Sequence, residues 1–97
     1  MIELTNRVSN CVDALFSEED AFLAKGMLEN DCGHNLPLCE TYTPAQMDRI
    51  RLAALKLSKG SILELSNAIK LAQIDWRDLL MAAGFARDLS AHENWEW

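Results

Sequence analysis

The residues best suited to metal chemistry lie close together between positions 32 and 40. Cys32, His34 and Cys39 are potential zinc ligands there, and Glu40 is a conceivable fourth. Structural zinc sites use four thiolate or imidazole ligands, usually in Cys-x-x-Cys or His-x-x-x-His pairs. The spacing in this segment fits neither pair. We therefore expect reduced loop cysteines, no bound metal and no cofactor.

Catalytic chemistry has equally little support. General acid–base or nucleophilic catalysis needs a base beside a nucleophile, or two carboxylates, within a cleft. His34 falls in a predicted loop and His92 in the C-terminal tail, and neither belongs to a motif such as Gly-x-Ser-x-Gly. The four glycines are isolated from one another, so there is no glycine-rich phosphate loop. We expect a protein that is not an enzyme.

The first half of the chain is predicted to hold two helices. Apolar residues recur every three or four positions from Glu3 to Phe16, which predicts an amphipathic helix. Ser17 precedes three acids and is a suitable N-cap for a second helix that ends near Glu29. Residues 30–42 have no period and contain a glycine and a proline, so they are predicted to form one long loop.

A third helix is predicted from Thr43 to about Ser58. Threonine is a good N-cap, and Pro44 at the first helical position loses no hydrogen bond. Gly60, just beyond the end, suits the left-handed conformation that often terminates helices. The inward stripe of this helix is predicted to consist of Met47, Ile50, Ala54 and Leu57.

Two further helices follow with clear boundary signals. Ser61 and Glu64 form a capping box that starts the fourth helix. Asp75 is predicted to cap a fifth helix that begins at Trp76 and stops at Gly84. Both boundaries predict tight turns, so consecutive helices should be neighbours in space.

These elements define the expected fold class as all-α, a compact bundle of five to six short helices. The sixth helix would lie around Leu89 and His92. A chain of 97 residues supports one hydrophobic core, so residues 1–97 are predicted to form a single helical domain. Within it, residues 1–41 are an acidic helical pair plus the start of the loop. Residues 43–97 are a capped helical core with an aromatic tail.

The formal charge of −6 comes from one half of the chain. Residues 1–48 hold two basic and nine acidic residues, whereas residues 49–97 hold seven basic and six acidic ones. Such asymmetry indicates either a functional surface or simply a solvated helix face. A functional acidic surface would favour a basic partner. It would not favour direct nucleic-acid binding, which depends on clustered lysine and arginine.

A helix-turn-helix is the strongest sequence argument for DNA binding. The third helix has a basic flank, and a short turn precedes the helix that starts at Trp76. The helix that starts at Trp76 would have to be the recognition helix. It offers only Arg77 to phosphates or bases and continues as an apolar run, which is typical of a core helix. The residues of the basic flank are Arg49, Arg51, Lys56 and Lys59.

The C-terminal tail carries Trp95 and Trp97 on either side of Glu96. Tryptophan is enriched at interaction hot spots, so the tail could join the protein to a partner. Alternatively, Trp95 folds back over the bundle while Trp97 frays. Trp76 has apolar residues one turn further along and is predicted to be in the core.

The cysteine count and the N-terminus indicate a cytoplasmic protein. Three cysteines are an odd number, which does not fit a disulfide framework. No basic segment followed by a long apolar stretch opens the chain. The longest apolar run, residues 79–83, is far shorter than the roughly 20 residues that span a bilayer. We predict no membrane segment.

Residues 42–95 resemble a group of short, standalone bacterial proteins. The resemblance is carried by the segments Arg51-Leu52-Ala53-Ala54-Leu55-Lys56-Leu57-Ser58-Lys59-Gly60 and Asp75-Trp76-Arg77-Asp78-Leu79-Leu80-Met81-Ala82-Ala83-Gly84-Phe85. Most of these proteins have no assigned activity, but some similar small helical proteins are immunity proteins of polymorphic or contact-dependent toxin systems. The shared residues are helix-packing and capping residues, so the resemblance implies a fold and transfers no binding residue. Residues 1–41 lie outside it.

These observations together predict an immunity protein that neutralises a toxin domain, with a nuclease as the expected partner. A nuclease active site is basic because it holds phosphates, and an acidic surface can occupy it. The alternative is a small helical adaptor or regulatory module, and a weaker one is a DNA-binding regulator. The oligomeric state is left open. The predicted partner-binding residues are Glu18, Glu19, Asp20, Glu29, Asp31 and Glu40.

Overall fold

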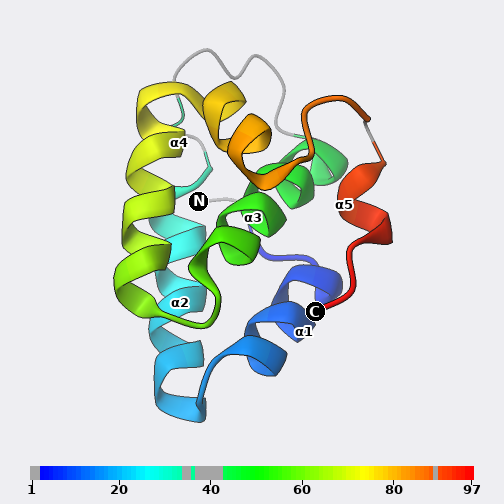
Figure 1. Ribbon diagram of the computed structural model, residues 1–97. Helices are drawn as coiled ribbons and strands as arrows, with labels where there is room; N and C mark the ends of the chain where they lie inside the picture. The colour runs from blue at the N-terminus through cyan, green and yellow to red at the C-terminus, as the bar shows by residue number, and fades with distance from the viewer. Residues whose placement is uncertain (1–2, 34–35, 37–42, 89) are drawn as a thin grey trace.

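The computed structural model describes residues 3–33, 36, 43–88 and 90–97 (Figure 1). Those ranges contain helices and no strand, which confirms the all-α class. The Cα radius of gyration is 11.7 Å, close to the value of about 12.5 Å expected for a compact domain of this length. The helices are α1 (Asn6–Leu15), α2 (Glu18–Asp31), α3 (Pro44–Ser58), α4 (Ile62–Ala83) and α5 (Ala91–Asn94).

Helix α3 is the centre of the bundle. Every residue from Ile50 to Leu55 is buried, so this helix is enclosed on all sides. Helix α4 packs along it most extensively, and α1 and α5 contact it as well. Helix α2 lies against α1 and α4 instead (Figure 1). The buried residues of α2 are Ala21, Ala24 and Leu28, which share one side of the helix, so its other side is left toward solvent.

The predicted caps set the helix starts. The hydroxyl groups of Ser17, Thr43 and Ser61 each accept a hydrogen bond from the backbone N–H three residues further on, as a capping residue should. Thr5 does the same for α1, which therefore begins at Asn6 and not near Glu3. The Thr5 hydroxyl also donates to Oδ1 of Asp48 at 2.7 Å. This bond ties the start of α1 to α3.

The predicted fourth and fifth helices meet end to end within α4. Asp75 has an extended backbone, with φ −159° and ψ 107°, and interrupts the helix. Its Oδ1 accepts a 3.0 Å hydrogen bond from the N–H of Arg77, so Asp75 caps the second segment as predicted. The segment then ends at Gly84, which has φ 80°. The N–H of Phe85 donates to the carbonyl of Leu80 at 2.8 Å, which completes a Schellman motif.

The turn between α3 and α4 explains a requirement for glycine. Gly60 has φ +81°, and a Cβ atom added there would lie 2.7 Å from the carbonyl oxygen of Leu15. The turn therefore rests directly on the end of α1. Lys59 also adopts the left-handed conformation, with φ 51°, but its side chain is exposed.

We expect Gly60→Ala and Lys59→Gly to change stability in opposite directions. The alanine would combine a left-handed conformation, which costs about 1–2 kcal/mol, with the clash against Leu15. The glycine would relieve the conformational strain at position 59 without touching a neighbour. Urea unfolding followed by circular dichroism measures both free energies. A Gly60→Ala variant as stable as the parent would contradict the close approach to α1.

Candidate partner-binding surface

The cysteines assemble no metal site among the residues that the structure describes. Cys32 is fully buried at the end of α2, and its carbonyl accepts a 3.0 Å hydrogen bond from Nε of Arg51. Cys11 is also fully buried, and burial raises the pKa of its thiol to about 12, against the opposing effect of Arg7. No group of three potential metal ligands occurs in the described ranges. Outside those ranges lie His34, Cys39 and Glu40.

Two arginines of α3 are buried and donate to main-chain carbonyls. Arg51 is fully buried, and besides its bond to Cys32 its Nη1 donates to the carbonyl of Glu3 at 3.0 Å. Arg49 is 7% exposed, and its Nη2 donates to the carbonyl of Phe85 at 2.7 Å. Burial lowers the pKa of Arg51 from 12.5, but an arginine is still charged at neutral pH. These charge-assisted bonds hold three distant segments against α3.

Lys56 extends the same arrangement toward the end of α4. Its Nζ donates to the carbonyl of Ala83 at 2.8 Å and lies 4.9 Å from the centre of the Phe85 ring. A cation at the C-terminus of a helix binds orphan carbonyls and complements the helix dipole. The basic flank predicted for the third helix is thus largely internal.

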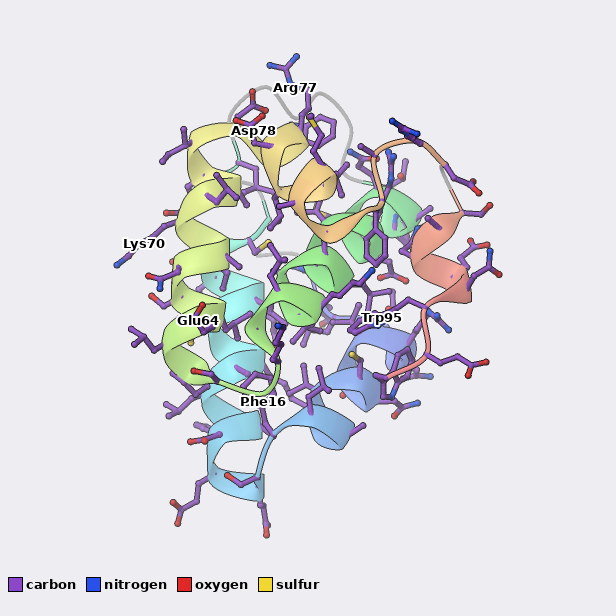
Figure 2. All side chains as sticks on the ribbon, in the orientation of Figure 1. Phe16, Glu64, Lys70, Arg77, Asp78 and Trp95 are labelled. Carbon is purple, nitrogen blue, oxygen red and sulfur yellow. The ribbon has the colours of Figure 1, made fainter. Side chains whose placement is uncertain are left out.

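The C-terminal tail folds back onto α1. Nη2 of Arg7 donates to the carbonyls of His92 at 3.0 Å and Glu93 at 2.9 Å, and the guanidinium lies 4.9 Å from the centre of the Trp97 ring. Trp95 is half-buried against the core and packs near Phe85 (Figure 2). Trp97 is 40% exposed, and one face of its ring lies against the Arg7 guanidinium. Trp76 is half-buried against the core.

The acidic first turn of α2 is on the surface. Glu18 and Glu19 are exposed, and Asp20 is half-buried. The hydroxyl of Ser17 accepts the N–H of Asp20 at 3.3 Å, which places the three acids at the positive end of the helix dipole. The structure thus brings together half of the predicted partner-binding residues.

The remaining predicted residues lie at the other end of α2. Eleven residues separate Asp20 from Asp31, which places them about 16 Å apart along the helix axis. Asp31 is exposed, and its carbonyl accepts a 3.0 Å hydrogen bond from Nε2 of Gln73 on α4. Glu29 is half-buried, and its negative charge raises the pKa of Arg51, against the larger effect of burial. Glu40 is outside the described residues.

The sequence prediction missed two apolar residues of this surface. Phe22 is 80% exposed and Leu23 is 54% exposed. The buried stripe of α2 consists of Ala21, Ala24 and Leu28, spaced by three and four residues, so the intervening apolar positions must face outward. A helical projection of residues 18–31 shows apolar residues all around the helix, so a helix covered on one side only must expose some of them, but the projection does not say which.

Three exposed cations remain outside the internal network. Lys59, Lys70 and Arg87 are exposed, and Lys70 projects from α4 away from the bundle (Figure 2). Arg77 is also exposed but pairs with the carboxylate of Asp75 at 2.9 Å. Among the described residues, no helix has the length and apolar composition needed to cross a bilayer.

Comparisons with known proteins assign no family to this geometry. No family model, no curated protein and no solved structure matches the chain. The resemblance of residues 42–95 to small helical bacterial proteins stays a prediction. Function is therefore argued from the chemistry of the surface.

His92 is a buried titratable residue of the C-terminal tail. Its side chain is buried beside Phe85, and its Nδ1 has no hydrogen-bond partner among the described residues. Burial is the main cause that lowers the pKa of His92 below 6.5. The two arginines, Arg7 and Arg49, lower the pKa further. The carboxylates that oppose this shift are Glu93 and Asp48.

We predict that His92 makes stability depend on pH below 6.5. The unfolded chain takes up the proton near pH 6.5, whereas the folded chain takes it up only at lower pH. The contribution is therefore complete above pH 6.5 and is lost as the pH falls, by at most about 1.4 kcal/mol per pH unit for one proton. Urea unfolding at several pH values should give a shallower acid loss for His92→Gln than for the parent. Equal slopes would contradict a neutral, buried His92.

Proposed function

We propose that this chain is an immunity protein that binds and neutralises a basic bacterial toxin domain, a nuclease, through its acidic surface. The supporting observation is the sorting of charge between interior and surface. Six of the nine basic residues donate to carbonyl or carboxylate oxygens of the same chain, whereas Glu18 and Glu19 in the first turn of α2 are exposed and Asp20 is half-buried. The six are Arg7, Lys25, Arg49, Arg51, Lys56 and Arg77.

The mechanism is occupation of a phosphate-binding cleft by carboxylates. A nuclease cleft attracts negative charge, so Glu18, Glu19 and Asp20 would draw the two proteins together and compete with the nucleic acid. Glu29 and Asp31 lie at the other end of α2, and Glu40 is included in the proposal on its sequence alone. Long-range attraction raises the association rate, and closely packed contacts then set the lifetime of the complex.

An adaptor that uses its tail is the second candidate, because Trp97 is 40% exposed. Its tail is already bound internally, since Arg7 holds the carbonyls of α5 and the Trp97 ring. Deletion of residues 95–97 should abolish partner binding by an adaptor and affect an immunity protein less. An upstream gene for a large secreted protein with a toxic C-terminal domain would favour immunity.

A pull-down from the producing cells tests the proposed function. The tagged chain should capture a basic protein that degrades nucleic acid and kills cells when it is expressed alone. Co-expression of this chain should restore growth, and the purified pair should lose nuclease activity at an equimolar ratio. A captured partner that is harmless in the absence of this chain would refute the proposal.

Charge reversal tests the placement of the acidic surface. The triple variant Glu18→Lys, Glu19→Lys, Asp20→Lys should bind the captured toxin domain at least about tenfold more slowly at low salt, and the difference should shrink as salt screens the charges. Stopped-flow association measures both effects. An unchanged rate would refute this placement.

Two control variants distinguish the effect of where the charges lie from the effects of net charge and of altered folding. The triple variant Glu64→Lys, Asp78→Lys, Glu93→Lys changes the net charge equally, but at exposed sites on α4 and α5. It should slow association less. The neutral variant Glu18→Gln, Glu19→Gln, Asp20→Asn puts no new cations at the start of α2, where cations would oppose the helix dipole. Its rate should fall between those of the parent and the reversed triple variant.

A further inference from the structure

The solvent side of α2 carries two exposed apolar side chains and a glycine. Phe22 and Leu23 are 80% and 54% exposed, and Gly26 follows them by four and three residues. Residues at these spacings are neighbours on a helix surface. Glu19 precedes the pair by one turn, and Asn30 follows Gly26 by one turn; both are exposed. We call these five residues the outer face of α2.

Gly26 has no role in the fold that would require glycine. A Cβ atom added there would meet no atom within 4 Å, and its backbone is not among the positive-φ positions of the described residues. Glycine inside a helix lowers helix stability relative to alanine. Phe22 and Leu23 likewise expose apolar area without packing against the core. The glycine lowers the stability of the helix, and the exposed apolar side chains lower the solubility of the isolated protein. Both would allow another molecule to approach α2 closely.

We propose that the outer face of α2 docks in an apolar recess of the toxin domain whose rim carries lysine or arginine. This inference rests on the proposed function and specifies how that complex is held. Phe22 and Leu23 enter the recess, as aromatic and aliphatic anchors do in helix-in-groove complexes. The absent side chain at Gly26 lets the recess wall approach the backbone of α2. Glu18 and Glu19 then lie beside the basic rim.

Charge decides between this occupant and the alternatives. A second copy of the chain would bring its own Glu18 and Glu19 to the same contact, and each copy carries a formal charge of −6. Like charges brought together in an interface disfavour it. Nucleic acid and anionic lipid are disfavoured for the same reason. A recess that is lined by apolar groups and edged by cations complements both the apolar side chains, Phe22 and Leu23, and the acidic ones, Glu18 and Glu19.

Helix α4 provides matched controls. Leu63 is 69% exposed and Asn67 is exposed four residues later; on α2, Leu23 is 54% exposed and Asn30 is exposed seven residues later. Leu63 is followed by Glu64, and the helix continues without glycine up to Ala83. The pairs Leu23 with Leu63 and Asn30 with Asn67 therefore have the same residue types but different surroundings.

Site-specific photo-crosslinking in the producing cells tests the face directly. Benzoylphenylalanine replaces Leu23, Asn30, Leu63 or Asn67 in four separate variants. Positions 23 and 30 should crosslink to one and the same protein, and positions 63 and 67 should not. Crosslinks to a second copy of this chain, or equal yields at all four positions, would overturn the inference.

Affinity measurements with the purified crosslinked protein complete the test. Phe22→Ala should weaken its binding at least about tenfold without changing the melting temperature greatly, whereas Leu63→Ala should leave binding unchanged. Gly26→Ala should raise the melting temperature and yet weaken binding several-fold. A Gly26→Ala variant that is more stable and binds as well as the parent would overturn the close approach at Gly26.

The outcomes distinguish the two proposals. If the protein captured at positions 23 and 30 is not toxic, the proposed function fails while the docking face stands. If the toxin domain is captured but Phe22→Ala binds it normally, the function stands and this docking mode fails.

Discussion

The structure depends on cationic side chains that bind the carbonyl groups at chain and helix ends. Arg51 is the clearest case, because it is fully buried within the central helix and joins the end of α2 to the segment before α1. Arg49 and Lys56 hold the chain around the end of α4, and Arg7 holds the end of α5. Carbonyls buried at helix ends are costly unless they receive donors. Short helices have many such ends, so this bundle needs its cations inside.

This internal use of cations determines what the surface can do. A basic flank on α3 would favour phosphate binding if its side chains faced solvent, but Arg49, Arg51 and Lys56 direct their donors to the main chain. The acids accept from main-chain N–H groups instead, and the bonds that Asp75 and Asp88 receive in this way lie in exposed turns. Negative charge therefore gathers outside, and the start of α2 is a favourable place for it because the helix dipole stabilises acids there. The same interactions that hold the bundle together leave an acidic exterior.

Local signals predicted most of the fold. Ser17, Thr43 and Ser61 cap the helices that they were expected to cap, because capping depends on a residue and its near neighbours along the chain. The burial of Arg51 was not predictable in this way, since its acceptors lie 19 and 48 residues away. The acidic turn of the candidate site was visible in the sequence. The outward position of Phe22 required knowledge of which side of α2 the bundle covers.

That covered side explains why α2 differs from α3. Helix α3 is enclosed along Ile50 to Leu55, so any change in the apolar residues of that stretch affects the core. Helix α2 buries Ala21, Ala24 and Leu28 and packs Met27 partly against the core, which leaves Phe22 and Leu23 without a role in its packing. Exposed Phe22 raises the risk of self-association, and Gly26 weakens the helix. In the complex that we propose, Phe22 would be covered and Gly26 would allow close contact, so both residues would gain a function there.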